Sequence, residues 1–358
     1  MTEEEPGAAQ QPSGGHRAAR LIDIASAVGV HPSTVSRVLN GGIGHSIRPE
    51  TVRRIRAEAR SRGYRPNAQA RALRRHRTGA LAFVVPMLRN PSWVRLQRGA
   101  LLRAAERGYV VMITEEPTED PMPPGAYGYL VTESRVDGLL IATALRANGT
   151  GPEEALSPVP HVYVNRRGPD RGNDVVMDEA GAVRLFLEHV AGLGHRSVLL
   201  VDGPADVDTV HRRVLATRRY CAVMGLRAAV RNAPATEEGG FTAIRRLLAA
   251  GPLPTAIGVG SIDQVFGVLA ALRSERVAVP GDVSLVSFDE DEYLAYLDVP
   301  VSTVCMPLAE LGAAAVDALI ARIDGDSEAD VLVREPMYLV SRGSAGPAPA
   351  GAGPAETG

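Results

Sequence analysis

Hydrophobic and polar positions recur at two different spacings along this chain, and the change of spacing divides it into a head and a body. Between residues 21 and 61 apolar residues return every three or four positions, as in LIDIASAV, which is the spacing of amphipathic helices. From residue 80 onward, short apolar runs such as ALAFVV and SVLLV alternate with longer helical patterns. The pattern therefore predicts a small all-α N-terminal domain followed by a larger α/β domain.

The body repeats strand and helix patterns in turn, which is typical of parallel sheets covered by helices on both faces. Its length is enough for two doubly wound lobes, and we expect them at 79–177 plus 282–308 and at 178–281 plus 309–343. Ligands of such sheets bind at the carboxyl ends of the strands, which here would meet between the lobes. The expected strands are 80–85, 109–113, 136–142, 159–164, 197–201, 256–259, 282–288 and 301–304, and the expected helices are 93–107, 180–192, 209–225, 240–250, 264–274 and 307–324.

The head contains two short helical patterns separated by Gly29, a residue suited to the left-handed backbone that ends many helices. Pro32 can open the second helix, whose opposite face is small and polar with one Arg, as a helix needs to enter the major groove of DNA. Any surface helix has a polar face, so the helix–Gly–helix spacing is what makes the prediction specific. A third helix is expected at 49–61. In the second helix the apolar face holds Val35, Val38 and Leu39, and the polar face holds Ser33, Thr34 and Arg37, with Ser36 and Asn40 at its margins.

Charge is distributed unevenly along the chain. Residues 17–77 hold 14 Arg and three acidic residues, a formal charge of +11, whereas the remaining residues carry −13 and the whole chain −2. A basic head on an acidic body indicates a polyanionic partner for the head alone.

The segment 66–78 joins the head to the body and carries one large apolar residue, Leu73, among Arg residues. It buries too little surface to fold by itself. Two interpretations remain open. Leu73 wedges between base steps in the minor groove while the Arg residues neutralise phosphates, or the segment is a linker with an incidental Leu.

Several function classes lack their sequence signals. No apolar run reaches the roughly 18 residues of a membrane span, and the polar, acidic N-terminus is unlike a secretory signal. Cys221 and Cys305 lie far apart and are most simply reduced thiols, so we expect a cytoplasmic protein without a membrane partner. With neither a G-x-S-x-G motif nor a metal-ligand cluster in the sequence, we expect no enzyme activity, metal or cofactor, and interpret His195 as structural. The tails 1–19 and 344–358 are expected to be disordered.

Six motifs in a fixed order resemble the LacI family of bacterial transcription regulators, and they extend over nearly the whole chain outside the tails. The resemblance implies a helix-turn-helix DNA-binding domain (20–65), a hinge helix and linker (66–78) that folds on DNA, and a core (79–343) like type I periplasmic sugar-binding proteins. It also implies a repressor that binds near-palindromic operator DNA as a homodimer and responds to a small-molecule effector between the lobes. The motifs are DIASAVGVHPSTVSRVLN (23–40), RPETVRRI (48–55), GYRPNAQARALR (63–74), VDGLLIA (136–142), LGHRSVLLVDGP (193–204) and VPGDVSLVSFDE (279–290). Two shorter matches, PVSTV near 300 and RGS (342–344), follow in the same order.

Matching positions in the family imply roles for individual residues. Each has an alternative: Trp93 as a core residue, Arg213 as part of a solvated cationic helix face, and Asp289 as a structural residue. The resemblance favours Leu73 as an intercalating hinge residue. It implies DNA contacts by Ser33, Thr34, Ser36, Arg37, Asn40 and Leu73, and ligand contacts by Trp93, Asn165, Arg213, Asp263 and Asp289.

The chain also departs from the family pattern. Arg20, His31 and Arg48 stand where members have Ser or Thr N-caps, so we expect three weakened helix starts. The family's Asn-Asp sugar-binding pair reads Ser261-Ile262-Asp263, and counting back from the next Gly places Ile262 at the Asp position unless one gap restores Asp263. The effector is therefore expected to be a sugar or, given this departure, a non-sugar ligand. A solute-binding protein would explain the body but not the basic head.

Overall fold

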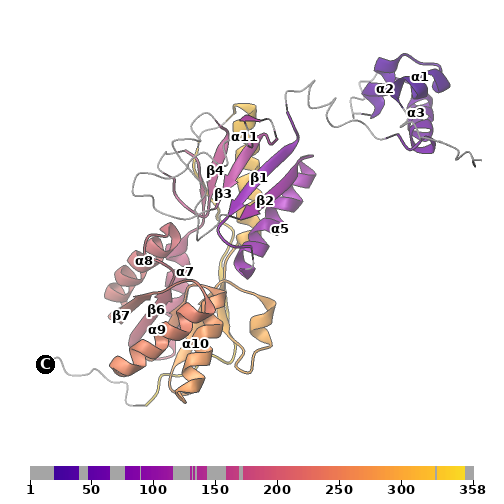
Figure 1. The fold of residues 1–358 in the computed structure, drawn as a ribbon. Coiled ribbons are helices and arrows are strands. Elements are labelled where there is room, and N and C mark those ends of the chain that lie inside the picture. The colour runs from indigo at the N-terminus through magenta and orange to yellow at the C-terminus, as the bar shows by residue number, and fades with distance from the viewer. Residues whose placement is uncertain are drawn as a thin grey trace, which may run out of the picture. The chain divides into compact units, whose positions relative to one another are not determined.

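A computed structural model of the chain describes residues 20–39, 47–64, 77–88, 90–115, 130, 132–133, 135–142, 159–168, 172–326 and 329–350. The chain divides into two compact units, Met1–Arg77 and Thr78–Gly358 (Figure 1). Asn40, Leu73 and most of the predicted hinge segment lie outside the described residues, as does the predicted tail 1–19.

The head consists of the three predicted helices, α1 (Leu21–Val28), α2 (Pro32–Leu39) and α3 (Pro49–Ser61). Gly29 ends α1 with a φ of 72°, the left-handed conformation that its position predicted. The apolar faces of the helices meet in a small core because each helix carries apolar residues at helical spacing. That core contains Ile24, Ala25, Val28, Val35, Val38, Val52, Ile55 and Ala59.

Two of the three unusual helix starts are compensated locally. The Asp23 carboxylate accepts a hydrogen bond from the Arg20 main-chain N–H at 2.8 Å, at the first turn of α1. At the start of α2, Nδ1 of His31 accepts the main-chain N–H of Ser33 at 3.2 Å, which is the bond that a Ser or Thr cap normally supplies. Arg48 makes no side-chain cap bond at α3, so the expected weakening concerns this helix most directly.

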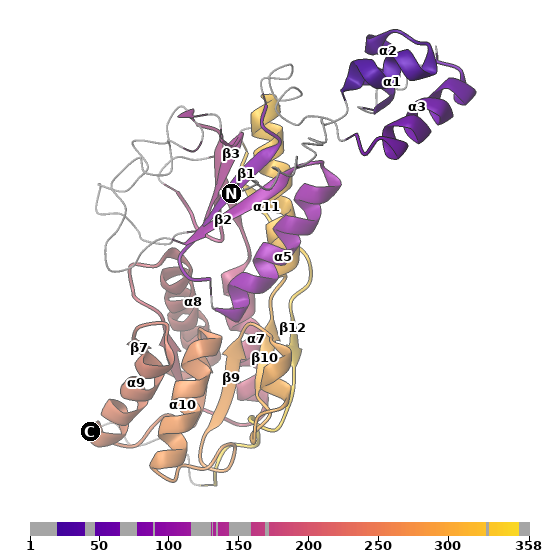
Figure 2. The ribbon, with the colours of Figure 1, turned by 45° about the vertical axis from the view of Figure 1, so that its right-hand side comes forward.

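The first lobe is built on a six-stranded sheet with the order β11-β5-β4-β3-β1-β2, in which neighbouring strands run parallel. Two helices pack against each other and cover one face of this sheet (Figure 2). The strands are β1 (Ala80–Val85), β2 (Val110–Glu115), β3 (Gly138–Ile141), β4 (His161–Val164), β5 (Asp174–Val176) and β11 (Val331–Leu332), and the helices are α5 (Pro91–Glu106) and α11 (Leu308–Asp324).

The second lobe has a six-stranded sheet with the order β12-β10-β9-β8-β6-β7, parallel except for β12 against β10. Helices α9 and α10 pack together, and α7 packs with α8. The strands are β6 (Ser197–Asp202), β7 (Arg227–Asn232), β8 (Ala256–Val259), β9 (Ser284–Phe288), β10 (Ser302–Cys305) and β12 (Tyr338–Val340). The helices are α7 (Glu179–Gly192), α8 (Asp208–Met224), α9 (Glu237–Ala250), α10 (Ile262–Ser274) and the short 3-10 helix η2 (Glu292–Ala295).

The predicted division into lobes is wrong for the last part of the chain. Strands β9 and β10 extend the second sheet from β8, so residues 282–306 belong to lobe 2 and not to lobe 1. Helix α11 packs on α5, β3 and β4, so it belongs to lobe 1 and not to lobe 2. The reason is that successive strand–helix units usually lie side by side, and the chain keeps adding neighbours to one sheet until it crosses after β10.

Each lobe contains a helix pair that approaches closely at a glycine. In lobe 1, a Cβ at Gly99 on α5 would overlap the main-chain carbonyl of Ala309 on α11. In lobe 2, a Cβ at Gly267 on α10 would overlap the carbonyl of Glu237 on α9. These positions therefore accept no larger side chain without a shift of the helices.

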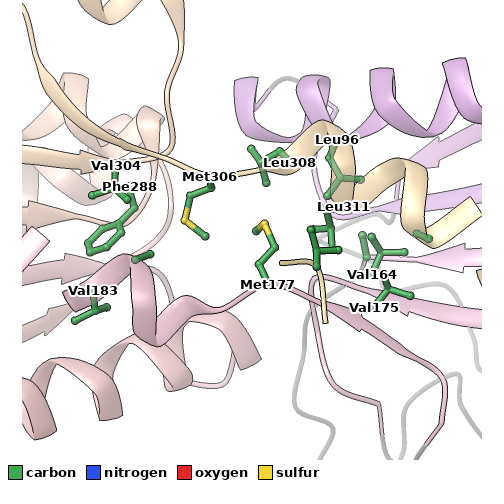
Figure 3. Packing of buried hydrophobic residues seen from close by; sticks show 14 of the residues in the cluster. Leu96, Val164, Val175, Met177, Val183, Phe288, Val304, Met306, Leu308 and Leu311 are labelled. Atoms are coloured by element: carbon green, nitrogen blue, oxygen red, sulfur yellow. The ribbon is translucent and has the colours of Figure 1, made fainter. Parts of the chain in front are cut away.

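The crossing segments between the lobes carry buried methionines. Met177 lies between β5 and α7, and Met306 lies between β10 and α11. Both side chains are 2% exposed, and Figure 3 shows them facing each other between the lobes. They belong to a hydrophobic cluster that includes Leu96 of lobe 1 and Phe288 of lobe 2, so the two lobes share one continuous core.

The disordered C-terminal tail was predicted to begin at residue 344, but the first residues of that stretch pack against lobe 2. Ser344 is fully buried, accepts the main-chain N–H of Ser302 at 2.8 Å and donates to the carbonyl of Leu285 at 2.6 Å. His195, also fully buried, bonds through Nε2 to the carbonyl of Gly346 at 3.1 Å, a structural role as expected. Ser344 and Gly346 are the buried residues of the stretch 344–350, and their hydrogen bonds to Ser284, Leu285 and Ser302 hold it against lobe 2.

Candidate functional site

The free face of α2 has the character predicted for DNA contact. Ser33 and Arg37 are exposed and Thr34 is partly exposed, while Val35 and Val38 on the other face are buried in the head. Ser36 is partly exposed at the margin of the free face. The Ser33 hydroxyl lies 2.8 Å from Nδ1 of His31, so the cap also orients this side chain. The helix thus presents short polar side chains and one guanidinium, the groups that read base edges in the major groove.

A second candidate site is a pocket of about 190 Å³ between the two lobes. It is lined by residues that follow the carboxyl ends of β1, β4, β6, β8 and β9 and by the first turns of α5 and α8. This is the location expected for ligands of doubly wound sheets. Its polar or aromatic lining consists of Asn90, Ser92, Trp93, Asn165, Asp202, Thr209, Arg213, Ser261 and Asp289.

The structure brings together four of the five residues predicted for ligand contact: Trp93, Asn165, Arg213 and Asp289. Asp263 is not part of the pocket lining: it lies in the first turn of α10 and is buried, so its contact with a ligand stays a prediction. Ile262 is also excluded, since its side chain is 1% exposed in the hydrophobic core of lobe 2. The residue of this segment that lines the pocket is Ser261.

Arg213 is held by carboxylates of the protein itself. Its Nε and Nη2 donate to the two oxygens of Asp202 at 2.8 and 3.0 Å, and Nη1 lies 3.4 Å from Oε2 of Glu179. Its guanidinium also lies over the ring of Phe288, 5.5 Å from the centroid. Burial lowers the pKa of Arg213, but Asp202 and Glu179 outweigh this effect and raise the pKa overall, so the side chain stays charged.

Two residues at the pocket have a backbone conformation that is uncommon outside glycine. Asn165 has a φ of 58° and Asp289 a φ of 77°. Burial raises the pKa of Asp289, although a hydrogen bond from the Ser92 hydroxyl and the charge of Arg213 act in the opposite direction. Such strained positions cluster at functional sites, where the surrounding structure holds side chains in fixed directions.

Hydrogen bonds cross between the lobes at the borders of the pocket. Nη1 of Arg95 on α5 donates to the carbonyl of Glu290 at 2.8 Å. At a second border the main-chain N–H of Arg167 donates to Oδ2 of Asp208 on α8 at 3.2 Å. Arg212, also on α8, reaches the carbonyl of Asn165 at 3.5 Å. A change in lobe geometry would therefore alter groups next to the ligand position.

Sequence reasoning missed Asp202, Ser92 and Ser261 as pocket residues. Asp202 directly follows the apolar run SVLLV, and an acidic residue at the end of a parallel strand was an available signal. Ser92 and Ser261 carried no comparable signal, because serine is common at the start of helices.

Family models match both parts of the chain. Residues 20–67 match the model described as bacterial regulatory proteins, lacI family, and residues 187–345 match a periplasmic binding protein-like domain. The chain carries a lacI-family DNA-binding domain followed by a periplasmic-binding-protein-like domain.

Relatives match along most of the chain. The ribose operon repressor of Escherichia coli (strain K12) is 28% identical, over 91% of this chain and all of that protein. The regulator PtxS of Pseudomonas aeruginosa is 29% identical, over 91% of this chain and 96% of that protein. The crystal structure of a LacI family regulator from Mycobacterium smegmatis matches 75% of this chain and 99% of its own, with 27% identity and a TM-score of 0.69.

The fold is also that of the lac repressor dimer bound to operator and the anti-inducer ONPF. That structure matches 92% of this chain and 99% of its own, with 24% identity and a TM-score of 0.76. Among the described residues, no helix is long and apolar enough to cross a membrane. The same part of the chain holds no group of three or more His, Cys, Asp or Glu residues suited to a metal ion.

Proposed function

We propose that this chain is a transcriptional repressor that binds operator DNA through α2 and responds to a small polar ligand between the lobes. The observation that carries the proposal is the exposed face of α2, where Ser33 and Arg37 stand opposite the buried Val35 and Val38. The formal charge of +11 on residues 17–77 supports it, because phosphate contacts supply much of the affinity of such proteins for DNA.

The residues proposed to contact operator DNA are those of the free face of α2 together with two that lie outside the described residues. The residues of α2 and Asn40 are predicted to read base edges, and Leu73 is predicted to enter the minor groove. They are Ser33, Thr34, Ser36, Arg37, Asn40 and Leu73. Because its DNA partner is the chromosome, the protein is proposed to act in the cytoplasm.

We expect the protein to act as a homodimer, since one small head reads too few base pairs for a specific site. Apolar groups on both lobes support an interface between two copies. Val94, Leu101 and Leu102 of α5 are 42–59% exposed. In lobe 2 a cavity of about 490 Å³ is lined by apolar residues, among them Phe266 and Leu297. Exposed apolar surface of this kind typically marks contact with another protein.

The pocket is proposed to hold the effector, with Trp93, Asn165, Arg213 and Asp289 among its contacts. The ligand changes operator affinity if it binds one lobe arrangement better than the other. The relation to a ribose operon repressor supports a small hydroxylated ligand. The lobes would transmit the change through the crossing segments to the chain that leads to the heads.

Binding to the DNA upstream of the protein's own gene tests the proposal. Fluorescence anisotropy of the full-length chain should show a complex that competes poorly with random DNA and weakens as salt rises. A matched duplex with a scrambled sequence is the control. Equal affinity for the two duplexes at every salt concentration would exclude the proposed function.

A further inference from the structure

The pocket between the lobes is acidic once its internal ion pair is counted. The charged residues among its described lining are Arg213, Asp202 and Asp289. Nε and Nη2 of Arg213 donate to the Asp202 carboxylate at 2.8 and 3.0 Å, and Nη1 lies 3.4 Å from the carboxylate of the buried Glu179. The positive charge of Arg213 is therefore already neutralised by the protein and attracts an anionic ligand poorly.

The carboxylate of Asp202 is already hydrogen-bonded within the protein, so it is not free to bind a ligand. Besides Arg213, its Oδ1 accepts the main-chain N–H of Gly203 at 2.8 Å. The backbone at Gly260 approaches so closely that a Cβ there would overlap the carboxylate. With Asp202 and Glu179 committed to Arg213, Asp289 is the remaining carboxylate of the described lining. Ionised together, these four buried side chains sum to a charge of −2, which the charge of the nearby Arg95 reduces to −1.

Two buried polar atoms of the pocket lining have no hydrogen-bond partner among the described residues. The Ser261 side chain is 8% exposed, and its hydroxyl has no partner among the described residues. Oδ1 of Asn165 is buried and equally without one. The Asn165 Oδ1 atom and the Asp289 carboxylate can only accept hydrogen bonds, and the Ser261 hydroxyl can accept or donate one. A buried acceptor without a donor lowers stability, so the fitting ligand brings N–H and O–H groups.

Trp93 adds an aromatic side chain to the same lining. Indole faces attract cations and also pack against the C–H faces of sugar rings. We infer that the effector is a small polyhydroxylated amine, such as an amino sugar, whose ammonium group binds at Asp289 and whose hydroxyls serve Asn165 and Ser261. This inference rests on the proposed function, because it names the ligand class of the same pocket.

Sugars that share a ring and differ in charge test the inference on the full-length protein. Each set contains a neutral sugar, its amine and its acid: glucose, glucosamine and glucuronate, or galactose, galactosamine and galacturonate. Thermal unfolding and calorimetric titration should show at least one amine that raises Tm and binds at least tenfold tighter than its neutral partner. The acids should give no shift. The inference would be overturned if a neutral sugar or an acid bound as tightly as the amine, or if none of the amines bound.

A variant separates charge recognition from general loss of the pocket. Asp289→Asn should lower the ratio of amine affinity to neutral-sugar affinity at least tenfold, so that the amine loses its advantage over the neutral partner. Glu188→Gln removes one negative charge at an exposed position of α7 in lobe 2, outside both cavities, and should change neither affinity. Equal losses for amine and neutral sugar in Asp289→Asn would contradict charge recognition.

The two proposals can fail independently. Sequence-selective DNA binding without any response to amines would overturn the inference and leave the proposed function standing. Amine binding by a chain that does not distinguish the upstream duplex from its scrambled control would overturn the proposed function instead.

Discussion

Arg95 on α5 donates a hydrogen bond from Nη1 to the main-chain carbonyl of Glu290, 2.8 Å away in the loop after β9. The bond joins lobe 1 to lobe 2 at the residue that follows Asp289, which lines the pocket. The pocket residue Asp289 and the interlobe bond at Glu290 are therefore adjacent in the chain, so ligand binding and lobe closure are expected to affect each other.

Replacing Arg95 should weaken closure of the lobes. Arg95→Ala removes the bond to the Glu290 carbonyl and a weak one to the Cys305 sulfur. The first is worth about 1 kcal/mol, so effector affinity should fall roughly fivefold. Titration of the effector against a preformed operator complex measures this shift. Arg98→Ala on the exposed face of the same helix is the control and should leave the titration unchanged. An identical response of the two variants would show that the interlobe bond has no part in closure.

The close approach of α5 and α11 makes a stability prediction. Gly99→Ala forces a methyl group onto the carbonyl of Ala309 and should lower the free energy of unfolding by about 1–3 kcal/mol. Gly192→Ala is the matched control, because this helical glycine has open space around its Cβ position and should be neutral or slightly stabilising. Urea unfolding followed by circular dichroism compares them. Similar midpoints for the two variants would mean that the helices separate without penalty.

Arg37 should contribute to sequence recognition, and not merely to charge. Arg37→Ala is expected to lower operator affinity by about 1–3 kcal/mol while binding to random DNA falls less. Arg56→Ala on α3 removes the same charge from an exposed position of the head and should weaken both duplexes alike. Anisotropy titrations at fixed salt provide the comparison. A uniform loss in Arg37→Ala would assign this side chain to the phosphates.

The stability of the core should fall in mild acid. Burial lowers the pKa of His195 and of His189 below the ordinary value of 6.5. The unfolded chain then binds protons that the folded chain does not, so the free energy of unfolding decreases as pH drops below about 6.5. Urea midpoints between roughly pH 7.5 and 5.5 measure the slope.

A variant of His189 can assign part of this slope. Its Nε2 is buried without a hydrogen-bond partner among the described residues, whereas His195 bonds to Thr255 and Ser284. His189→Leu should therefore flatten the pH dependence without removing a bond of the core. An unchanged slope would leave His195 and the remaining groups as its source.

Continuous apolar runs made most strands predictable, and their absence explains the ones that were missed. Ala80–Val85 was predicted at both ends because every residue of that run is apolar. Strand β7 was missed because it is an edge strand with mostly exposed residues and polar ends. Strand β5 has three residues, too few for a pattern.

The pocket was predictable in position and less so in chemistry. Trp93, Asn165, Arg213 and Asp289 meet because strand ends converge between the lobes, which topology alone implies. Which carboxylate pairs with Arg213 depends on the path of the chain between strands. For that reason the sequence did not single out Asp202 among the many acidic residues. Assignment of β9, β10 and α11 to lobes failed for the same reason, since sequence order does not specify where the chain crosses.

Met177 and Met306 meet where the chain passes from one lobe to the other. Unbranched thioether side chains can change rotamer to fill a space of altered shape, so a rotation about this point leaves no void. Two orientations of the lobes can then lie close in free energy, with neither locked by packing. In such a balance, a ligand worth only a few kcal/mol of preferential binding decides which population predominates.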